Sequence, residues 1–110
     1  MHRKLARALL TNVYHEVSAV VSLGEKQEIL DVFLFDTMFY RGKLRIAEKA
    51  RAVYLISNHP EGRKEPYEQD LRRYTALCLT AREIPVKLFI SSEYFTCCEA
   101  EVPFFRKDVI

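Results

Sequence analysis

The feature that most constrains this chain is the run EILDVFLFD, residues 28–36, in which aliphatic and aromatic side chains follow one another almost without interruption. Such residues favour a strand that is buried in a sheet. Two shorter runs, VYLIS at residues 53–57 and PVKLFI at residues 85–90, have the same character. The sequence therefore predicts a sheet at the centre of the protein.

Two other segments have the helical period. The first helix is expected over residues 3–22 and stops before Gly24, since glycine often ends a helix. The second is expected over residues 67–83 and starts after Pro66, whose missing N–H is not needed there. Each apolar stripe predicts a helix that packs on the sheet. The positions that define the two stripes are Leu5, Leu9, Val13, Val17 and Val20, and then Leu71, Tyr74, Cys78 and Ala81.

Further strands are predicted at residues 37–46, 52–57, 86–90 and 94–98. A short helical piece is expected at 47–51. Because strands and helices alternate without a strict βαβ repeat, we expect an α/β (α+β) fold, a mixed β-sheet flanked by helices. A chain of 110 residues is long enough for one core. We expect a single compact domain, with an N-terminal amphipathic helix at 1–27 and the sheet at 28–110.

Composition narrows the class of protein. Hydrophobic residues at 49% and charged residues at 29% are typical of a soluble globular chain and exclude a disordered one. No apolar run approaches the roughly 18 residues that span a bilayer, so no membrane partner is expected. Asn12, His15 and Glu16 interrupt any signal-peptide core. Three cysteines, with Cys97 and Cys98 adjacent, form neither a disulfide framework nor a zinc knuckle, which favours a cytoplasmic protein.

The charge balance does not indicate nucleic acid. The chain has 17 basic and 15 acidic residues and a net charge of +2. Solvated helix faces explain the basic residues equally well, because acids lie near them. We therefore assign no nucleic-acid-binding residues and keep DNA association as an alternative. The basic residues considered are Arg3, Lys4, Arg7, the RGKLR run at 41–45, Arg63, Lys64, Arg72 and Arg73.

The stretch SNHPEGRKEPYEQD, residues 57–70, resembles the HxHPxGxxxPSxxD hallmark of the RadC-like branch of the JAB/MPN (JAMM) metallopeptidase family. Five hallmark positions match without a gap: His59, Pro60, Gly62, Pro66 and Asp70. The first and last of them are 70 − 59 = 11 positions apart, as in the family. Weaker similarity extends over roughly residues 28–98: EILDVFLFD, YRGKL at 40–44 and IPVKLFISSEYFTCC at 84–98. The resemblance implies a JAB/MPN-like fold with cytidine-deaminase-like layering.

The same resemblance implies a metal site, in which two histidines and an aspartate hold zinc and an upstream glutamate is the general base. Carried over by position, His59 and Asp70 are vestigial ligands and Glu28 is a vestigial base. Ser57 stands where the first histidine belongs, and a hydroxyl is a poor and short replacement. Tyr67 stands at the hallmark serine, and we expect its ring to fill the emptied pocket with its hydroxyl on His59 or Asp70. We interpret the site as degenerate, with no cofactor.

Each of these residues also has an ordinary structural role. A carboxylate such as Asp70 is favoured in the first turn of a helix. A histidine before proline, such as His59, is commonly a hydrogen-bonded loop residue, and Glu28 at a strand start is commonly solvated. Gly62 and Pro66 are typical turn and helix-start residues.

The leading hypothesis is thus a RadC-like JAB domain protein without metallopeptidase activity, acting as a binding or structural module for a protein partner. One alternative is a zinc-dependent metallohydrolase, a peptidase or isopeptidase, that recruits a substitute ligand from His15, His2 or a second subunit. The other is a DNA-associated protein. A homo-oligomer stays open, and the sequence identifies neither a substrate nor a particular partner.

Overall fold

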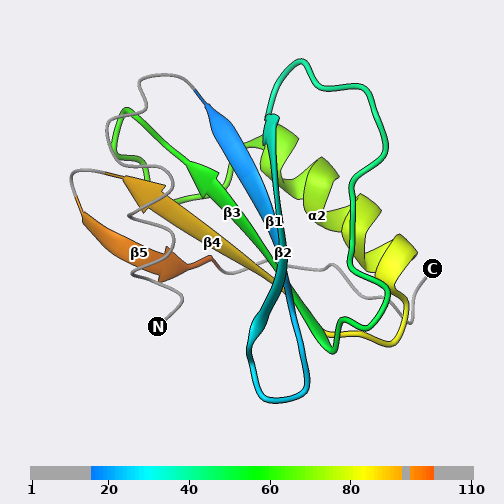
Figure 1. The fold of residues 1–110 in the computed structure, drawn as a ribbon. Helices are drawn as coiled ribbons and strands as arrows, with labels where there is room; N and C mark the ends of the chain where they lie inside the picture. The colour runs from blue at the N-terminus through cyan, green and yellow to red at the C-terminus, as the bar shows by residue number, and fades with distance from the viewer. Residues whose placement is uncertain (1–15, 93–94, 101–110) are drawn as a thin grey trace.

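The computed structural model describes residues 16–92 and 95–100, which form one five-stranded sheet and one helix (Figure 1). This is a mixed α+β fold, as predicted. The strand order is β2-β1-β3-β4-β5, with β3 and β4 parallel and the other neighbouring pairs antiparallel. The elements are β1 (Val17–Leu23), β2 (Ile29–Asp36), β3 (Ala52–Asn58), α2 (Glu68–Ala81), β4 (Val86–Ser92) and β5 (Phe95–Glu99).

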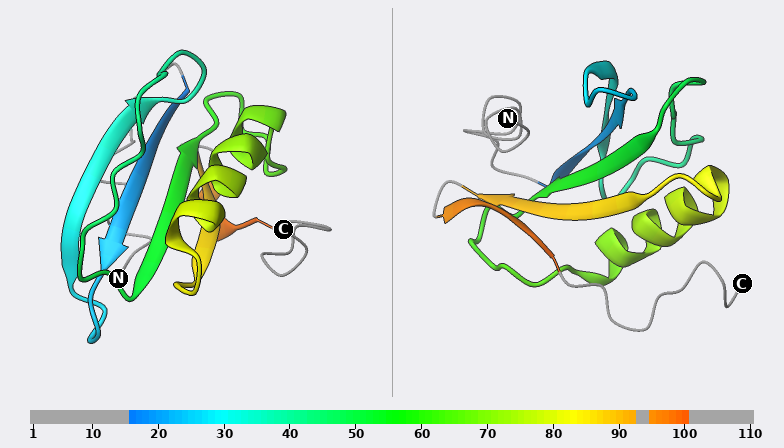
Figure 2. Two further views of the ribbon diagram at one scale, coloured as in Figure 1. Left: turned by 90° about the vertical axis from the view of Figure 1, so that its right-hand side faces the viewer. Right: turned by 90° about the horizontal axis from the view of Figure 1, so that it is seen from below.

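Helix α2 covers one face of the sheet, which we call the helix face (Figure 2). Leu77, Cys78 and Ala81 of α2 are buried there against sheet residues such as Val20 and Leu55. The predicted helix over 67–83 is therefore confirmed, and its stripe packs on the sheet as expected. On the other face a second cluster is also buried: Ala19, Val21, Leu23, Ile56 and Cys97.

The predicted helix over residues 3–22 is wrong for residues 17–22, which form strand β1. Residues 3–15 lie outside the described part of the chain. β1 pairs with β2 on one side and β3 on the other, and from Ser18 onward it is buried on both faces. A strand buried on both faces has no polar alternation, so its valines could fit a helical stripe. The expected boundary between residues 27 and 28 falls inside the β1–β2 hairpin.

The predicted strands at 28–36, 52–57, 86–90 and 94–98 correspond to β2, β3, β4 and β5, with small shifts at their ends. The strand expected over 37–46 is wrong, because the chain turns directly after β2. The carboxylate of Asp36 accepts the N–H groups of Met38 and Phe39 at 2.9 and 2.8 Å, which is the usual way an aspartate forms a turn. The helical piece expected at 47–51 is a turn, closed by the Ala50 N–H on the Ala47 carbonyl.

Residues 37–50 run without ladder partners and pack on the helix face beside α2. The Tyr40 ring contacts Phe33 and Phe35 at centroid distances of 5.6 and 5.7 Å. Arg73 of α2 donates hydrogen bonds to the carbonyls of Thr37 and Tyr40. This segment therefore covers the part of the sheet that α2 does not reach.

The parallel β3–β4 pair determines where the site forms. The chain leaves the C-terminal end of β3, passes through a nine-residue loop at 59–67 and starts α2 at the same end of the sheet. The loop and the first turn of α2 are therefore brought next to the end of β3. Within the described residues, no helix has the length and apolar character needed to cross a membrane.

Candidate functional site

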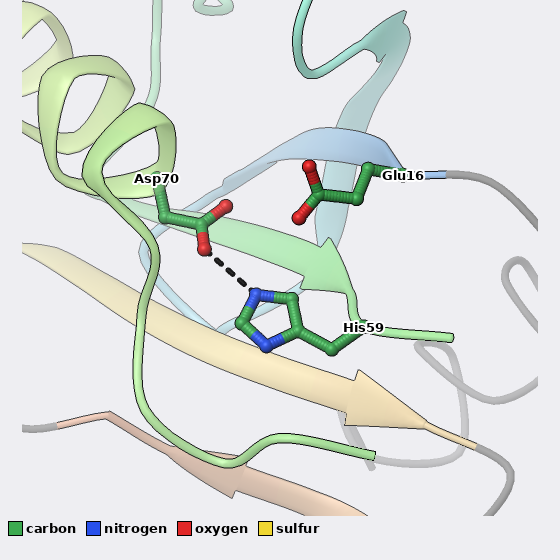
Figure 3. Close-up of side chains that lie close together, drawn as sticks. All are labelled: Glu16, His59 and Asp70. Carbon is green, nitrogen blue, oxygen red and sulfur yellow. Dashed lines mark hydrogen bonds and ion pairs between the residues drawn. The ribbon is translucent and has the colours of Figure 1, made fainter. Parts of the chain in front are cut away.

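The site lies at the C-terminal end of β3, on the helix face of the sheet. Alternate residues of a strand share a face, so Val53, Leu55, Ser57 and His59 follow one another toward the strand end. The antiparallel register places Val20 of β1 opposite Leu55 and Ser18 opposite Ser57. Along both strands the side chains thus change from apolar to hydroxyl to ionisable. The ionisable layer contains Glu16, His59 and Asp70 (Figure 3).

His59 is fully buried, and both of its ring nitrogens are hydrogen-bonded. Nε2 lies 2.7 Å from Oδ2 of Asp70, and Nδ1 lies 2.7 Å from the carbonyl oxygen of Arg63. Because a carbonyl can only accept, Nδ1 carries a proton and Nε2 faces the carboxylate. Burial disfavours the charged ring, but the hydrogen bonds to Asp70 and Arg63 outweigh it and raise the pKa of His59.

The spacing His59-Pro60-x-Gly62 has a local explanation. The Gly62 N–H donates to the His59 carbonyl at 2.9 Å, and Gly62 has a φ of 82°, in the left-handed region that favours glycine. This turn directs the chain back, so that the Arg63 carbonyl reaches Nδ1 of His59. The matched histidine, proline and glycine therefore orient the imidazole.

Asp70 belongs to both the helix and the site. It is the third residue of α2, and its Oδ2 accepts the backbone N–H of Tyr67 at 2.8 Å as well as the contact with His59. A carboxylate at this position stabilises the start of a helix. The other oxygen, Oδ1, is buried and has no hydrogen-bond partner. Asp70 thus offers one free acceptor to whatever lies beside it.

Glu16 is the residue that sequence analysis missed. It directly precedes β1, and its carboxylate points toward His59 and Asp70 (Figure 3). Possible ligand atoms of the three residues lie within 4.8 Å of one another, and Oε1 of Glu16 is buried without a partner. Burial, followed by the charge of Asp70, raises the pKa of Glu16. Alternation from Ser18 backward predicts this placement, but only once residues 17–23 are known to be a strand.

Glu28, the expected vestigial base, is not brought into the site. It lies in the β1–β2 hairpin, where its carboxylate accepts the N–H of Lys26 at 2.9 Å. Seven residues of β1 separate that hairpin from Glu16, a distance of about 20 Å along the strand. The carboxylate next to His59 and Asp70 is Glu16, so the assignment of Glu28 is corrected.

Ser57 points to the same face as His59 and is buried. Its Oγ lies 2.9 Å from Oγ of Ser18, which in turn lies 2.6 Å from Oγ1 of Thr37. These three hydroxyls form a hydrogen-bonded chain between the apolar core and the ionisable cluster. Ser57 is thus part of that hydrogen-bonded chain and satisfies its hydrogen bonding there.

Tyr67 covers the outer side of His59. The two rings have a centroid distance of 4.2 Å and an interplanar angle of 30°. The Tyr67 hydroxyl, expected on His59 or Asp70, instead lies 3.5 Å from Oε2 of Glu61. Beyond this ring opens a pocket of about 550 Å³, lined by Glu16, Met38, Pro60, Glu61, Tyr67, Glu68 and Gln69.

The three side chains of the cluster can be compared with the protein ligands of a typical zinc site. One imidazole and two carboxylates are acceptable ligands, and two buried oxygens lack partners. Two tetrahedral ligands at about 2.1 Å from zinc lie about 3.4 Å apart, which is longer than the 2.7 Å between His59 and Asp70. The residues therefore fit a divalent cation in kind, once the hydrogen bond between His59 and Asp70 opens.

Comparisons of this chain with protein-family models, with curated proteins and with solved structures return no match.

Proposed function

We propose that this chain is a RadC-like JAB domain without metallopeptidase activity, which acts as a binding or structural module for another protein. One observation carries the proposal: the imidazole of His59 has both nitrogens in hydrogen bonds, to Asp70 and to the Arg63 carbonyl. In the family pattern His59 and Asp70 would hold zinc together with a second histidine. Ser57 stands at that position, and its hydroxyl bonds to Ser18.

The chemistry of hydrolysis supports the same proposal. A catalytic zinc site needs three protein ligands and a separate base that takes a proton from the bound water. Glu16 is the carboxylate that joins His59 and Asp70 within 4.8 Å in the described part of the chain. It can complete the ligand set or act as the base, but a single carboxylate does not do both.

The test is metal content and activity of the same preparation. The protein is purified without chelators, its metals are measured by mass spectrometry, and hydrolysis of peptide and isopeptide bonds is assayed with and without added zinc. We expect no stoichiometric zinc and no hydrolysis above background. One tightly held equivalent of zinc, or zinc-dependent cleavage, would contradict the proposal.

A second candidate, the zinc-dependent hydrolase with a substitute ligand, is favoured by the unpartnered oxygens of Glu16 and Asp70. The substitutes expected from the sequence, His2 and His15, lie outside the described residues. Glu16 would take their place, and zinc would supply an activated water. The base would then come from the pocket lining, where Glu61 is the carboxylate that follows the His59–Pro60 turn.

The two candidates differ in how zinc binding responds to Glu16. Calorimetric titration with zinc of the wild type, Glu16→Gln and the control Glu25→Gln separates them. Glu25 is an exposed hairpin residue, so its variant has the same change in net charge. The second candidate requires binding by the wild type and by Glu25→Gln but not by Glu16→Gln. Weak binding that is equal in all three agrees with the first candidate.

DNA association has less support, because described basic residues are used inside the chain. Arg45 pairs with Asp31, Arg72 pairs with Glu68, and Arg73 bonds to backbone carbonyls. The acidic partners of Arg45 and Arg72 lower the local positive charge that a phosphate-binding patch needs.

A further inference from the structure

The pocket beside the cluster has an acidic lining. Glu16, Glu61 and Glu68 contribute carboxylates, and no lysine or arginine is among its described lining residues. The guanidinium carbon of Arg63 lies 4.8 Å from the centroid of the Tyr67 ring, but Arg63 does not line the pocket. Because the chain as a whole has a net charge of +2, this acidity is local. Its electrostatic complement is a cation.

A second observation, at Asp70 next to the lining residue Glu16, points to the same kind of ligand. Asp70 is fully buried, and its unpartnered Oδ1 is directed toward the carboxylate of Glu16 (Figure 3). Oε1 of Glu16, which is a lining residue, is also buried without a partner. Buried acceptors without donors are costly, and two carboxylates that face each other repel. A hydrogen-bond donor with positive charge relieves both costs.

The walls of the pocket fit a cation that has an apolar stem. Met38 and Pro60 contribute aliphatic surface, and Tyr67 contributes its ring. Lysine and arginine side chains place their methylene groups on apolar surface and their charged head at the polar end. Apolar walls of this kind provide no ligands for a hydrated metal ion.

The turn next to the pocket offers a second contact to a cation that belongs to a polypeptide. Phe39 is 74% exposed, although its turn is held firmly. Asp36 accepts the N–H groups of Met38 and Phe39, and Arg73 bonds to the carbonyls on both sides, at Thr37 and Tyr40. An exposed aromatic ring on a turn that is fixed in this way offers an apolar contact to a polypeptide whose cation enters the pocket.

We propose that this pocket binds a lysine or arginine side chain of a partner polypeptide, with the stem on Met38, Pro60 and Tyr67 and the charged head between Glu16 and Asp70. An apolar residue of the same partner segment packs on Phe39. The inference rests on the proposed function as a binding module and names the chemistry of the partner.

The experiment uses two-dimensional amide NMR of the full chain with defined probes. The first probes are the blocked amino acids Nα-acetyl-lysine methylamide and its arginine analogue. Their control is the Nε-acetylated lysine compound, which keeps the stem but lacks the charge. The second probe is the blocked tripeptide Leu-Lys-Leu, or Leu-Arg-Leu if arginine binds better. We expect saturable shifts at residues around the pocket with the charged probes and none with the acetylated one.

Variants locate the binding. Glu16→Gln should weaken the charged probe about tenfold, as expected for the loss of a charge-assisted hydrogen bond. The control Glu25→Gln, with the same change in net charge at the far end of the sheet, should bind like the wild type. Phe39→Ala should weaken the tripeptide and leave the single blocked residue unchanged. An equal effect of Phe39→Ala on both probes, or none on either, overturns the polypeptide part.

Failure of this inference is distinguishable from failure of the proposed function. No shift up to the limit of probe solubility, or equal shifts with the acetylated probe, overturns the pocket assignment even if the protein holds no zinc. Stoichiometric zinc or hydrolysis overturns the proposed function even if lysine binds. If Glu16→Gln and Glu25→Gln weaken binding of the charged probe equally, the probe responds only to the net charge of the protein. That result would also overturn the assignment.

Discussion

The imidazole of His59 and the carboxylate of Asp70 form a hydrogen bond of 2.7 Å in which neither side chain is exposed to solvent. The two residues are eleven positions apart, and their bond joins the chain directly after β3 to the first turn of α2. Together with the bonds to the Arg63 carbonyl and the Tyr67 amide, it links a strand end, a loop and a helix. Changes to either residue should affect both the fold and the pocket.

Asp70→Asn should destabilise the protein by about 3–5 kcal/mol, because it removes one partner of a buried pair and leaves the other uncompensated. Urea denaturation followed by circular dichroism measures this change. The control is Glu68→Gln in the same turn of α2, where the pair with Arg72 is exposed. That variant should cost about 0.5 kcal/mol or less. Similar effects of the two changes would mean that Asp70 acts only as a helix cap.

The stability of the protein should fall as pH rises above about 6.5, the unfolded pKa of histidine. The folded pKa of His59 is raised, so the folded state holds this proton more tightly than the unfolded state. The resulting stabilisation is complete below pH 6.5 and is lost as pH rises through the folded value. Denaturation curves at several pH values, with an NMR titration of the His59 ring, check this prediction. In Asp70→Asn the slope should flatten, and an unchanged slope would assign the effect to another group.

The double variant Ser57→His with Tyr67→Ser should gain zinc affinity by orders of magnitude. Position 57 lies on the same face as His59, two residues earlier in β3, and removal of the Tyr67 ring clears the outer side of the imidazole. Protons should be released on binding, because both histidines must be neutral. Calorimetric titration at two pH values measures affinity and proton release. Tyr67→Ser alone supplies no imidazole and should bind no better than the wild type.

The larger side chain at position 57 has a cost, since Ser18 and Thr37 fill the neighbouring space. Overpacking of this kind destabilises by about 1–3 kcal/mol. Ser57→His without the second change reports that cost in denaturation experiments. If the folded double variant binds zinc no better than the wild type, the resemblance at residues 57–70 is a coincidence of turn residues.

Arg73→Ala should destabilise the protein by about 2 kcal/mol, because the carbonyls of Thr37 and Tyr40 lose their donor. The matched control is its neighbour Arg72→Ala, whose guanidinium lies on the exposed side and pairs only with Glu68 among the described contacts. That change should cost about 0.5 kcal/mol or less. Hydrogen exchange should in addition rise in the Asp36–Tyr40 turn of Arg73→Ala. Equal exchange in both variants would show that the turn is held by Asp36 alone.

The parts of the fold that could be predicted are those with local signals. The run at 28–36 and the stripe from Leu71 to Ala81 each determine their own element, and both are confirmed. β1 could not be predicted in the same way, because its burial on both faces depends on β2 and β3. The segment at 37–46 has the composition of a strand, and the turn that replaces it depends on a single side chain, that of Asp36.

The residues of the candidate site also differ in how far they can be predicted from local sequence. His59 and Asp70 are predicted through the resemblance at residues 57–70, which lie in one continuous stretch of the sequence. Glu16 is 43 positions before His59 (59 − 16 = 43) and reaches it only through the β1–β3 register. Glu28 is assigned as the base only through the resemblance at EILDVFLFD, and in the structure it lies in the β1–β2 hairpin, away from His59 and Asp70. Contacts made across a sheet leave no local pattern in a single sequence, so the position of Glu16 could not be predicted.

The bond from the Tyr67 amide to Asp70 makes one backbone proton a built-in probe of the pocket. The same carboxylate oxygen accepts from that amide and faces His59, so protonation of the pair, entry of a cation or rupture of the helix start must each change the chemical environment of this N–H. One resolved amide resonance can therefore follow pH, ligands and local opening in the unmodified protein. A screening experiment on this chain needs no label beyond ¹⁵N and no known substrate.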